Sequence, residues 1–403
     1  MKKLLALLLA LTMLLALAGC AQKAEPAAET AAPTEEASPA EETAPAGEPA
    51  PTEQAAPTED APATHIVVDH ADNEVEVPTK IERIAVCDIY PLPSVISIFF
   101  DSADKIVGMA APSMSAAANG LLGELYPEIL NAETGFIDGS TINIEELMKL
   151  EPDVVFYSAS QPEEGELLKQ AGIPGIAISV NKWSYNAIET LTNWISLLSE
   201  LFPENNKTQI VEDYSVEMYN LVQERVASLP DEQRQRVFFL FQYTESNMLT
   251  SGRQFFGQWW ADAIGAVNVA QELEKDNSVA VDLEQVYAWN PSLIFITNFT
   301  TAQPQDLYEN TVGSYDWSPV EAVKNQNIFK MPLGMYRSYT PGVDTPVTLL
   351  WLAKNAYPAL FEDIDIVSIT KDYYLDVFGI TLTDEQAASI FSPSVAANKG
   401  FGN

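Results

Sequence analysis

Two arginines in predicted loops are the side chains best suited to bind an anionic ligand. The chain of 403 residues contains six arginines and has a formal net charge of −36. Arg337 is flanked by Tyr336 and Tyr339, and Arg253 also lies among aromatic residues in the second half of the chain. A guanidinium binds carboxylates and other oxyanions through paired hydrogen bonds, and aromatic rings cover the apolar faces of a ligand. We expect Arg337 first, and Arg253 second, to bind an anionic ligand beside these tyrosines.

Four more aromatic residues lie in loops that follow predicted buried strands. Ligands of open α/β sheets bind beyond the carboxyl ends of the strands, so residues in such loops are candidates for ligand contact. These candidates are Tyr90, Tyr157, Trp183 and Tyr243. The alternative for each ring is core or surface packing, and for Arg253 it is a surface ion pair.

A sequence repeat with an offset of 139 residues organises the folded part. Residues 142–156 and 281–295 each predict a capped helix, a proline break and a buried strand. Asn143 and Asp282 are the expected N-caps, because their side chains can accept hydrogen bonds from the first helical turn. The repeat therefore predicts two similar α/β halves.

One glutamate in each half occupies the second position of its predicted helix. Glu146 and Gln285, at the third position, are expected to turn back to the helix ends as in a capping box. Glu145 and Glu284 are then free to point outward. The alternative is that each acid only favours the positive end of the helix dipole, which contributes roughly 0.3–1 kcal/mol.

Composition argues against several classes of function. Nucleic-acid affinity depends on Lys and Arg. A chain this acidic is therefore a poor nucleic-acid binder. His65 and His70 are the two histidines, and both are expected at the surface. This disfavours a bare-metal site, a His-ligated haem and a Ser–His triad. A Tyr-ligated haem stays an alternative. Gly-Lys never occurs, which excludes a Walker-type phosphate loop. We expect no enzyme activity, no metal site and no cofactor; hydrolysis by a carboxylate pair stays an alternative because acids are abundant, but no motif singles out a pair.

The N-terminal part predicts export and tethering. Residues 1–19 combine a basic start with an apolar run that is typical of a secretory signal and too short for a comfortable transmembrane span. The run ends in Leu-Ala-Gly-Cys, which resembles the lipobox of bacterial lipoproteins, so Cys20 is the expected lipidation site. Residues 20–63 are rich in Ala, Pro and acids and predict a disordered tether.

The rest of the chain predicts an α/β fold with two lobes. Apolar runs at residues 84–86, 154–157, 237–241 and 293–297 fit parallel strands that are buried on both faces. A helical apolar pattern over residues 207–229 would extend roughly 34 Å and suits a rigid strut. We predict two doubly wound α/β lobes joined by one long helix. The N-terminal lobe, the connecting helices and the C-terminal lobe are assigned to residues 64–183, 184–229 and 230–403.

Short motifs follow one another in a defined order along residues 65 to about 392. Besides the two repeat units, they are Val68-Asp69, Val75–Pro78, Ile81–Ile84, Asp104–Gly108, Thr250–Gly252, Trp351–Ala353, Tyr357-Pro358, Phe361 and Phe378-Gly379. In this order they resemble the substrate-binding proteins of ABC importers for iron–siderophores, haem and cobalamin. The resemblance implies a ligand cleft between the two lobes and no chemistry on the ligand.

The resemblance also implies partners and a location. Glu145 and Glu284 match the glutamates that dock onto arginines of the ABC permease dimer in this family. A ferric siderophore is the ligand most expected, because a chelated ion needs only Arg and aromatic contacts, and haem or cobalamin are the alternatives. The protein would be lipid-anchored on the outer face of a bacterial cell membrane. A ligand-sensing lipoprotein that is not coupled to import is a further alternative.

Overall fold

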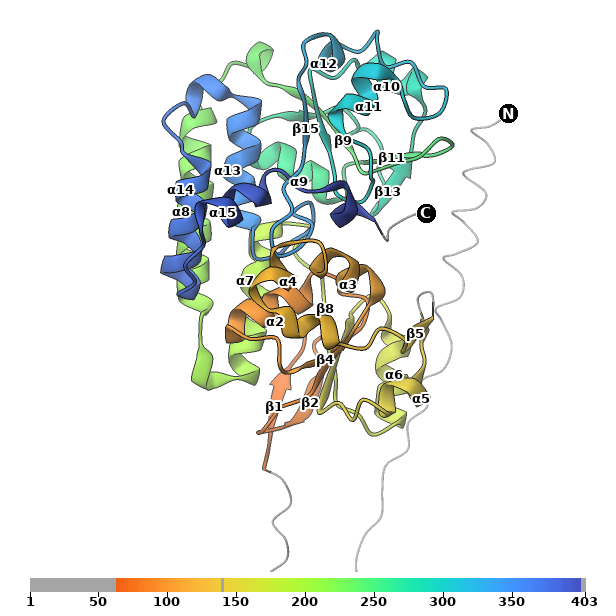
Figure 1. The fold of residues 1–403 in the computed structure, drawn as a ribbon, viewed down its shortest axis with the longest axis vertical. Helices are drawn as coiled ribbons and strands as arrows, with labels where there is room; N and C mark the ends of the chain where they lie inside the picture. Colours follow the sequence, from red (N-terminus) through yellow and green to blue (C-terminus); the bar gives the residue numbers. More distant parts are fainter. Residues whose placement is uncertain (1–62, 139–140, 400–403) are drawn as a thin grey trace, which may run out of the picture. The chain divides into compact units, whose positions relative to one another are not determined.

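The computed structural model describes residues 63–138 and 141–399. The predicted signal, Cys20 and all but the last residue of the tether lie outside this range. Figure 1 shows two α/β lobes in the described part, the first coloured orange to yellow-green and the second mainly green to blue. None of the helices described is long and apolar enough to cross a bilayer.

A parallel four-stranded sheet forms the centre of the first lobe. Its strand order is β4-β3-β7-β8, and all neighbouring strands are parallel. β3 and β7 are buried along their whole length, which confirms the strands predicted from apolar runs. The elements up to the second lobe are β1 (Thr64–Val68), β2 (Glu74–Pro78), β3 (Ile84–Val86), α2 (Leu92–Phe100), β4 (Ile106–Met109), α3 (Ala111–Ala117), α4 (Leu121–Leu125), η1 (Pro127–Asn131), β5 (Ile137–Asp138), β6 (Thr141–Ile142), α5 (Ile144–Met148), β7 (Val154–Ser158), α6 (Pro162–Gln170), β8 (Gly175–Ile178), α7 (Ala187–Leu201), η2 (Pro203–Asn205) and α8 (Thr208–Val226).

The second lobe is built around another parallel sheet of four strands, in the order β12-β9-β14-β15. A small antiparallel sheet, β10-β11-β13, accompanies it. The elements after α8 are η3 (Asp231–Gln233), β9 (Arg236–Leu240), β10 (Gln242–Tyr243), β11 (Met248–Ser251), α9 (Phe256–Ala263), β12 (Val267–Asn268), β13 (Ser278–Ala280), α10 (Leu283–Trp289), β14 (Leu293–Ile296), α11 (Pro304–Glu309), α12 (Glu321–Lys324), β15 (Ile328–Lys330), α13 (Thr345–Ala356), η4 (Pro358–Leu360), α14 (Ile366–Tyr373), the π-helix η5 (Tyr374–Phe378), α15 (Asp384–Ile390) and η6 (Val395–Asn398).

The two parallel sheets have the same topology, which confirms the predicted repeat. In each sheet the first strand lies between the second and the third, and the fourth lies beyond the third. The winding therefore reverses between β3 and β7 in the first lobe and between β9 and β14 in the second. Ligands of doubly wound sheets bind beyond the carboxyl ends of such strand pairs.

Helix α8 contributes to both lobes, as the predicted strut should. It covers residues 208–226, within the predicted 207–229. Val211, near its start, belongs to the core cluster of the first lobe, whereas Val222 and Val226 belong to that of the second. One continuous helix thus ties the two cores together.

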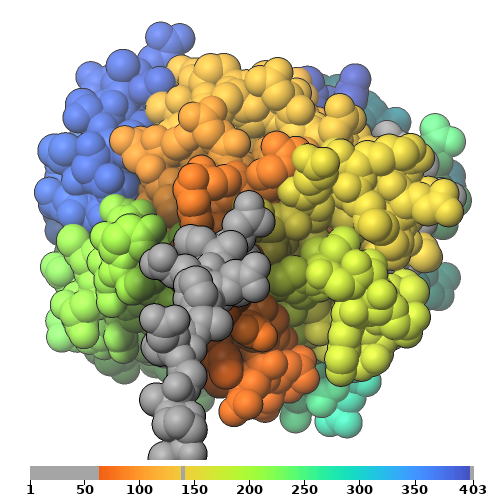
Figure 2. Space-filling view, turned by 90° about the horizontal axis from the view of Figure 1, so that it is seen from below, coloured from red at the N-terminus to blue at the C-terminus, as the bar shows by residue number. Residues whose placement is uncertain are grey.

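The C-terminal helices return to the first lobe. Tyr373, Tyr374 and Phe378 in α14 and η5 are buried in the first core cluster, although sequence assigned all of residues 230–403 to the second lobe. Figure 2 shows blue C-terminal residues beside orange first-lobe residues. The apolar pattern of a helix shows that one face is buried but does not show which core covers that face.

Candidate ligand-binding site

Arg337 lies at the switch point of the second lobe. Its side chain is 1% exposed. The guanidinium lies over the rings of Phe299 and Tyr336, 5.4 and 5.5 Å from their centroids, and Nη1 donates to the Tyr336 hydroxyl at 3.3 Å. Phe299 follows β14, so the arginine lies beyond the carboxyl end of that strand. Position, charge and aromatic neighbours match the expectation for an anion-binding side chain.

The C-terminal segment connects Arg337 to the first lobe. Nη2 of Arg337 donates to the carbonyl oxygen of Lys399 at 2.7 Å, and Oγ of Ser115 in α3 donates to the same oxygen at 2.9 Å. In Figure 1 the dark-blue C-terminal helices lie between the two lobes. Arg337 is therefore at the interface of the lobes.

Tyr90, from the first lobe, also lies at this interface. It follows β3 and packs against the core cluster that contains Tyr336 and Tyr339. Burial, and next the negative charge of Asp88, raise the pKa of the Tyr90 hydroxyl to about 12, and Tyr336 also contributes. The structure therefore brings Tyr90, Tyr336 and Arg337 together from two lobes.

Tyr339 belongs to a wall of aromatic side chains behind the arginine. It is fully buried, with ring centroids 5.5–6.0 Å from those of four phenylalanines, namely Phe239, Phe241, Phe255 and Phe256. Nε1 of Trp260 donates to the Tyr339 carbonyl oxygen at 2.9 Å. These contacts give Tyr339 a supporting position beside the site.

Asp344 fixes the loop that holds Arg337. Its Oδ2 accepts from the backbone N–H of Met335 at 2.8 Å, and the Tyr374 hydroxyl donates to Oδ1 at 2.5 Å. A side chain at Gly334 would come within 2.5 Å of this carboxylate, so the glycine permits the close approach. Burial raises the pKa of Asp344 to about 6, against these hydrogen bonds.

Lys330 is a second buried cation that sequence analysis did not select. Its Nζ donates to the carbonyl oxygens of Thr297, Thr300 and Ala302 at 2.7–2.8 Å. Burial lowers the pKa of Lys330 to about 7; the charge of Asp306 opposes this shift, and the charge of Arg337 contributes to it. In the sequence Lys330 is a single lysine at the end of a short strand, and its neighbours do not indicate that it is buried.

Asp88 and Glu164 form a pair of acids at the switch point of the first lobe, and sequence analysis missed them. Glu164 is 3% exposed, and neither of its carboxylate oxygens has a hydrogen-bond partner among the described residues. Oδ2 of Asp88 accepts from Nε2 of Gln161 at 3.0 Å. Burial, and then the charge of Asp88, raise the pKa of Glu164 to about 7. An acid at the third position of a helix that begins with proline gives the pattern of an ordinary exposed acid.

Four predicted contact residues have partners other than Arg337. Tyr157 lies against Gly165 of α6, and Trp183 meets His70 edge-on with centroids 4.9 Å apart. Tyr243 accepts a hydrogen bond from Nε1 of Trp317 at 2.9 Å. Arg253 is exposed, donates to the carbonyl oxygen of Gln271 at 3.1 Å and lies 3.9 Å from Glu274. Their part in ligand binding stays a prediction.

The two histidines are half-buried, not at the surface as predicted. Nδ1 of His70 accepts from the backbone N–H of Ser179 at 3.2 Å, and burial lowers the His70 pKa to about 4. His70 lies in the turn between β1 and β2, and its backbone N–H donates to the carbonyl oxygen of Ala177 in β8 at 3.0 Å. Among the described residues no group of three His, Cys, Asp or Glu side chains could hold a metal ion.

Glu145 and Glu284 are both exposed at the second position of α5 and α10. The N-cap predictions are confirmed, because Asn143 and Asp282 accept from the third backbone N–H of their helices at 3.2 and 2.8 Å. Gln285 turns back to the helix end as predicted and accepts from the backbone N–H of Asp282.

The same prediction for Glu146 is wrong. Its carboxylate instead accepts from Nζ of Lys149 at 2.6 Å. An i,i+3 basic residue is available in α5 and competes with the helix end for this carboxylate.

Every arginine of the chain donates to a main-chain carbonyl oxygen. The six donor–acceptor pairs are Arg83–Leu150, Arg225–Leu360, Arg234–Gly265, Arg236–Asn290, Arg253–Gln271 and Arg337–Lys399. The scarce arginines of this acidic chain thus fix backbone segments, and Arg337 is the most deeply buried of them.

Comparison with known proteins gives the family. The sequence pattern of the family described as "Periplasmic binding protein" matches residues 115–333, more than half of the chain. The chain therefore belongs to this family. It is a substrate-binding protein of the kind that serves ABC transporters outside the cytoplasm.

Individual relatives cover nearly the whole folded part. The chain is 27% identical over 351 residues to the molybdate-binding protein MolA of Haemophilus influenzae, with 81% of this chain and 94% of MolA covered. A solved periplasmic solute binding protein from Veillonella parvula has 26% identity and a TM-score of 0.73, covering 83% of this chain and 98% of that one. CeuE from Helicobacter pylori, solved with nickel and histidine, has 20% identity and a TM-score of 0.63, covering 82% and 99%. These relatives are solute-binding proteins and not enzymes.

Proposed function

We propose that this protein captures an anionic ligand at the interface between its lobes and delivers it to the permease of an ABC importer. The observation that carries the proposal is the buried guanidinium of Arg337, which donates to the carbonyl oxygen of Lys399, an oxygen that also accepts from Ser115 of the first lobe. A buried cation is costly unless hydrogen bonds or an anion compensate it. A ligand with a negative oxygen would find both charge and donors there.

A small oxyanion is the ligand class that we favour. Arg337 and Lys330 are close enough for the charge of one to affect the other, and with Lys330 protonated the two cations would favour a doubly negative ligand. Lys330 would act through its charge, since three carbonyl oxygens hold its amino group. The relative MolA is named for molybdate, which is a compact dianion.

A ferric siderophore, the ligand favoured by the sequence, is the second candidate. Its anionic groups would bind Arg337, and its apolar faces would pack against Tyr90, Tyr336 and Tyr339. Haem and cobalamin could use the same rings. The larger ligands would also involve the four predicted contacts with other partners, which are Tyr157, Trp183, Tyr243 and Arg253.

Ligand-dependent thermal stability tests the anion site. The purified protein is heated with molybdate, tungstate, sulfate, ferric siderophores, haemin or cobalamins. A ligand at 100 times its dissociation constant should add about 2.7 kcal/mol to the free energy of unfolding. Arg337→Gln should weaken that ligand at least tenfold, and Arg337→Lys should do so less. Arg234→Gln is the matched control, because Arg234 also bonds a carbonyl oxygen but lies near Gly265. Equal affinity in wild type and Arg337→Gln would disprove the site.

We also propose that Glu145 and Glu284 dock onto the permease, one from each lobe. Both side chains are exposed at equivalent positions of the repeat. Their carboxylates would meet arginines of a permease dimer. Lipid on Cys20 would hold the protein at the outer face of the bacterial membrane while it docks.

Charge reversal tests the docking surface. Glu145→Arg combined with Glu284→Arg should abolish uptake and leave ligand affinity unchanged, because neither residue contacts the Arg337 site. Glu217→Arg combined with Glu224→Arg, on the exposed side of α8, is the control and should transport normally. Normal uptake by the first double variant would refute docking at these positions, and it is the result expected of a ligand-sensing lipoprotein.

A further inference from the structure

We propose that Arg83 and Arg236 are positioning residues that hold helices α5 and α10 in matching orientations, and so set where Glu145 and Glu284 lie for the permease. The inference rests on the docking role proposed above. Its evidence is a set of contacts at the far ends of the two helices, which sequence analysis did not anticipate.

Packing holds each docking helix along one face only. α5 has five residues and α10 has seven, and helices this short are marginal on their own. Each has one fully buried residue, Leu147 in α5 and Val286 in α10, and partly buried side chains pack beside it on the same core. A short helix packed on one face can still tilt, so the direction of its exposed glutamate needs a second fixed point at the end of the helix.

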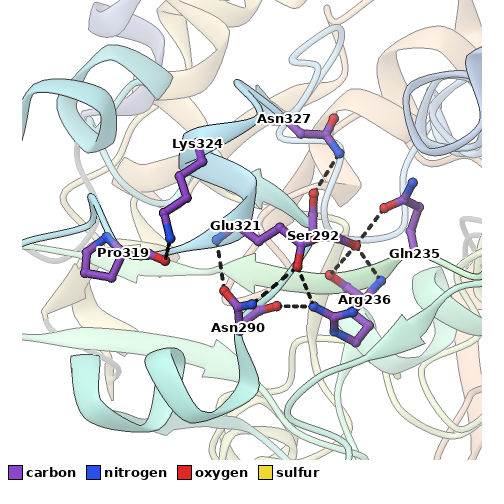
Figure 3. A network of polar contacts seen from close by, with 8 residues as sticks. All are labelled: Gln235, Arg236, Asn290, Ser292, Pro319, Glu321, Lys324 and Asn327. Atoms are coloured by element: carbon purple, nitrogen blue, oxygen red, sulfur yellow. Dashed lines mark hydrogen bonds and ion pairs between the residues drawn. The ribbon is translucent and has the colours of Figure 1, made fainter.

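Arg236 supplies the second point for α10. Figure 3 shows its guanidinium directed at the carbonyl oxygen of Asn290, the residue that ends this helix, and at Glu321 of α12. The ion pair with Glu321 measures 2.9 Å. Oδ1 of Asn290 also accepts from the backbone N–H of Glu321 at 2.9 Å. The end of α10 is therefore tied to both β9 and α12.

Arg83 supplies the second point for α5. Its Nε donates to the carbonyl oxygens of Leu150 and Glu151 at 2.8 and 3.1 Å, just beyond the end of the helix. Nη2 donates to Leu150 as well. These carbonyls lack partners within a helix that ends here, so the arginine satisfies them.

The two arginines occupy equivalent positions in their sheets. Arg83 directly precedes β3 and Arg236 begins β9, which are the first strands of the two sheets. The backbone N–H of each arginine donates to the side chain of the residue after the proline break, at 2.8 Å to Asp153 and 2.9 Å to Ser292. That same residue donates its own N–H to the carbonyl oxygen of the arginine, at 2.8 and 2.9 Å.

The helix ends also share an unusual backbone conformation. Glu151 and Asn290 both have a positive φ, 46° and 42°. Each stands before the proline of its repeat, where it turns the chain out of the helix and into the following strand. The arginine contacts thus fix a similar backbone turn after each helix. We infer that α5 and α10 have matching orientations relative to the strands that follow them.

Glutamine substitutions test the inference in the full-length protein. Arg83→Gln and Arg236→Gln, singly and together, should weaken binding to the purified permease complex, and the double variant should do so at least fivefold. Arg→Lys at the same positions keeps the charge and a donor, and should recover part of that loss. If the arginines only stabilised the fold, the Gln variants would have a lower thermal midpoint, but the Lys variants would not recover part of the permease affinity.

Distance measurement gives a readout that needs neither ligand nor permease. Nitroxide labels at Met148→Cys and Ala288→Cys, both exposed positions of the two helices, report the separation of α5 and α10. The distance distribution should be narrow in the otherwise native protein and broader in the Arg83→Gln and Arg236→Gln variants. An unchanged distribution with unchanged permease affinity would overturn the inference.

Arg225→Gln is the matched control. Arg225 also donates to a carbonyl oxygen at a helix end, that of Leu360 at 2.9 Å, and pairs with Asp363 at 2.6 Å. It should lose comparable stability and keep native permease affinity. If the charge reversal of Glu145 and Glu284 has no effect, the docking surface itself is wrong. If that reversal abolishes docking but Arg83→Gln and Arg236→Gln resemble Arg225→Gln, only the positioning role fails.

Discussion

At the scale of single residues, burial raises the pKa of Glu164, an acid that the sequence does not distinguish from an exposed one. Glu164 carries two buried carboxylate oxygens without a hydrogen-bond partner among the described residues, and Asp88 lies near it. An ionised carboxylate in that position is poorly solvated and repelled by its neighbour. Glu164 therefore holds its proton in the folded state to about pH 7.

This shift predicts a loss of stability between about pH 4.5 and pH 7. Over that interval the unfolded chain has released the Glu164 proton while the folded protein still binds it, so stability falls as pH rises. Above pH 7 the full penalty of roughly 3 kcal/mol applies. Denaturant unfolding should show Glu164→Gln equal to wild type near pH 4 and more stable at pH 8. The exposed Glu166→Gln is the control, and equal stability of wild type and Glu164→Gln at pH 8 would contradict the assignment.

The sequence indicated those residues of the candidate site that lie next to one another in the chain, and their part in ligand binding stays a prediction. Arg337 with Tyr336 and Tyr339 was found because charge and rings are adjacent in the chain. Lys330 and Glu164 were not found, because their special character comes from burial by segments distant in sequence. The same holds for Arg83 and Arg236, whose partners lie more than fifty residues away.

At the scale of elements, repeated local patterns were predictable and long-range packing was not. Both N-caps and the proline breaks of the repeat lie within short windows, and the structure confirms them. The apolar period of α8 likewise gave its position to within a few residues. α14 and η5 were assigned to the second lobe because they follow it in the chain, yet their apolar faces pack on the first core.

The positioning role of Arg83 and Arg236 belongs to this scale. A docking glutamate is useful only if its helix points the right way, and short helices take their direction from their ends. The permease-affinity and distance measurements above therefore examine elements and not side-chain chemistry.

At the scale of the whole molecule, the protein is strongly acidic and yet is proposed to bind an anion. Residues 64–403 contain 47 acidic and 18 basic side chains. The general field therefore repels an anion, and the attraction must be local, from buried cations at the lobe interface. The proposed permease docking would instead use negative charge, through Glu145 and Glu284 on the surface.

The way the arginines are used has a consequence for ionic strength. All six donate to uncharged carbonyl oxygens, whose hydrogen bonds are less sensitive to dissolved salt than attraction between full charges, and the ion pairs that four of them also form are half-exposed or at the surface and contribute little. Repulsion among the excess acids is screened by salt. The thermal midpoint should therefore rise between about 10 mM and 500 mM NaCl, where the Debye length falls from about 30 Å to a few ångströms. KCl should act equally, and a midpoint that falls with added salt would show that ion pairs dominate. Added salt, which destabilises proteins held together by surface ion pairs, should stabilise this one.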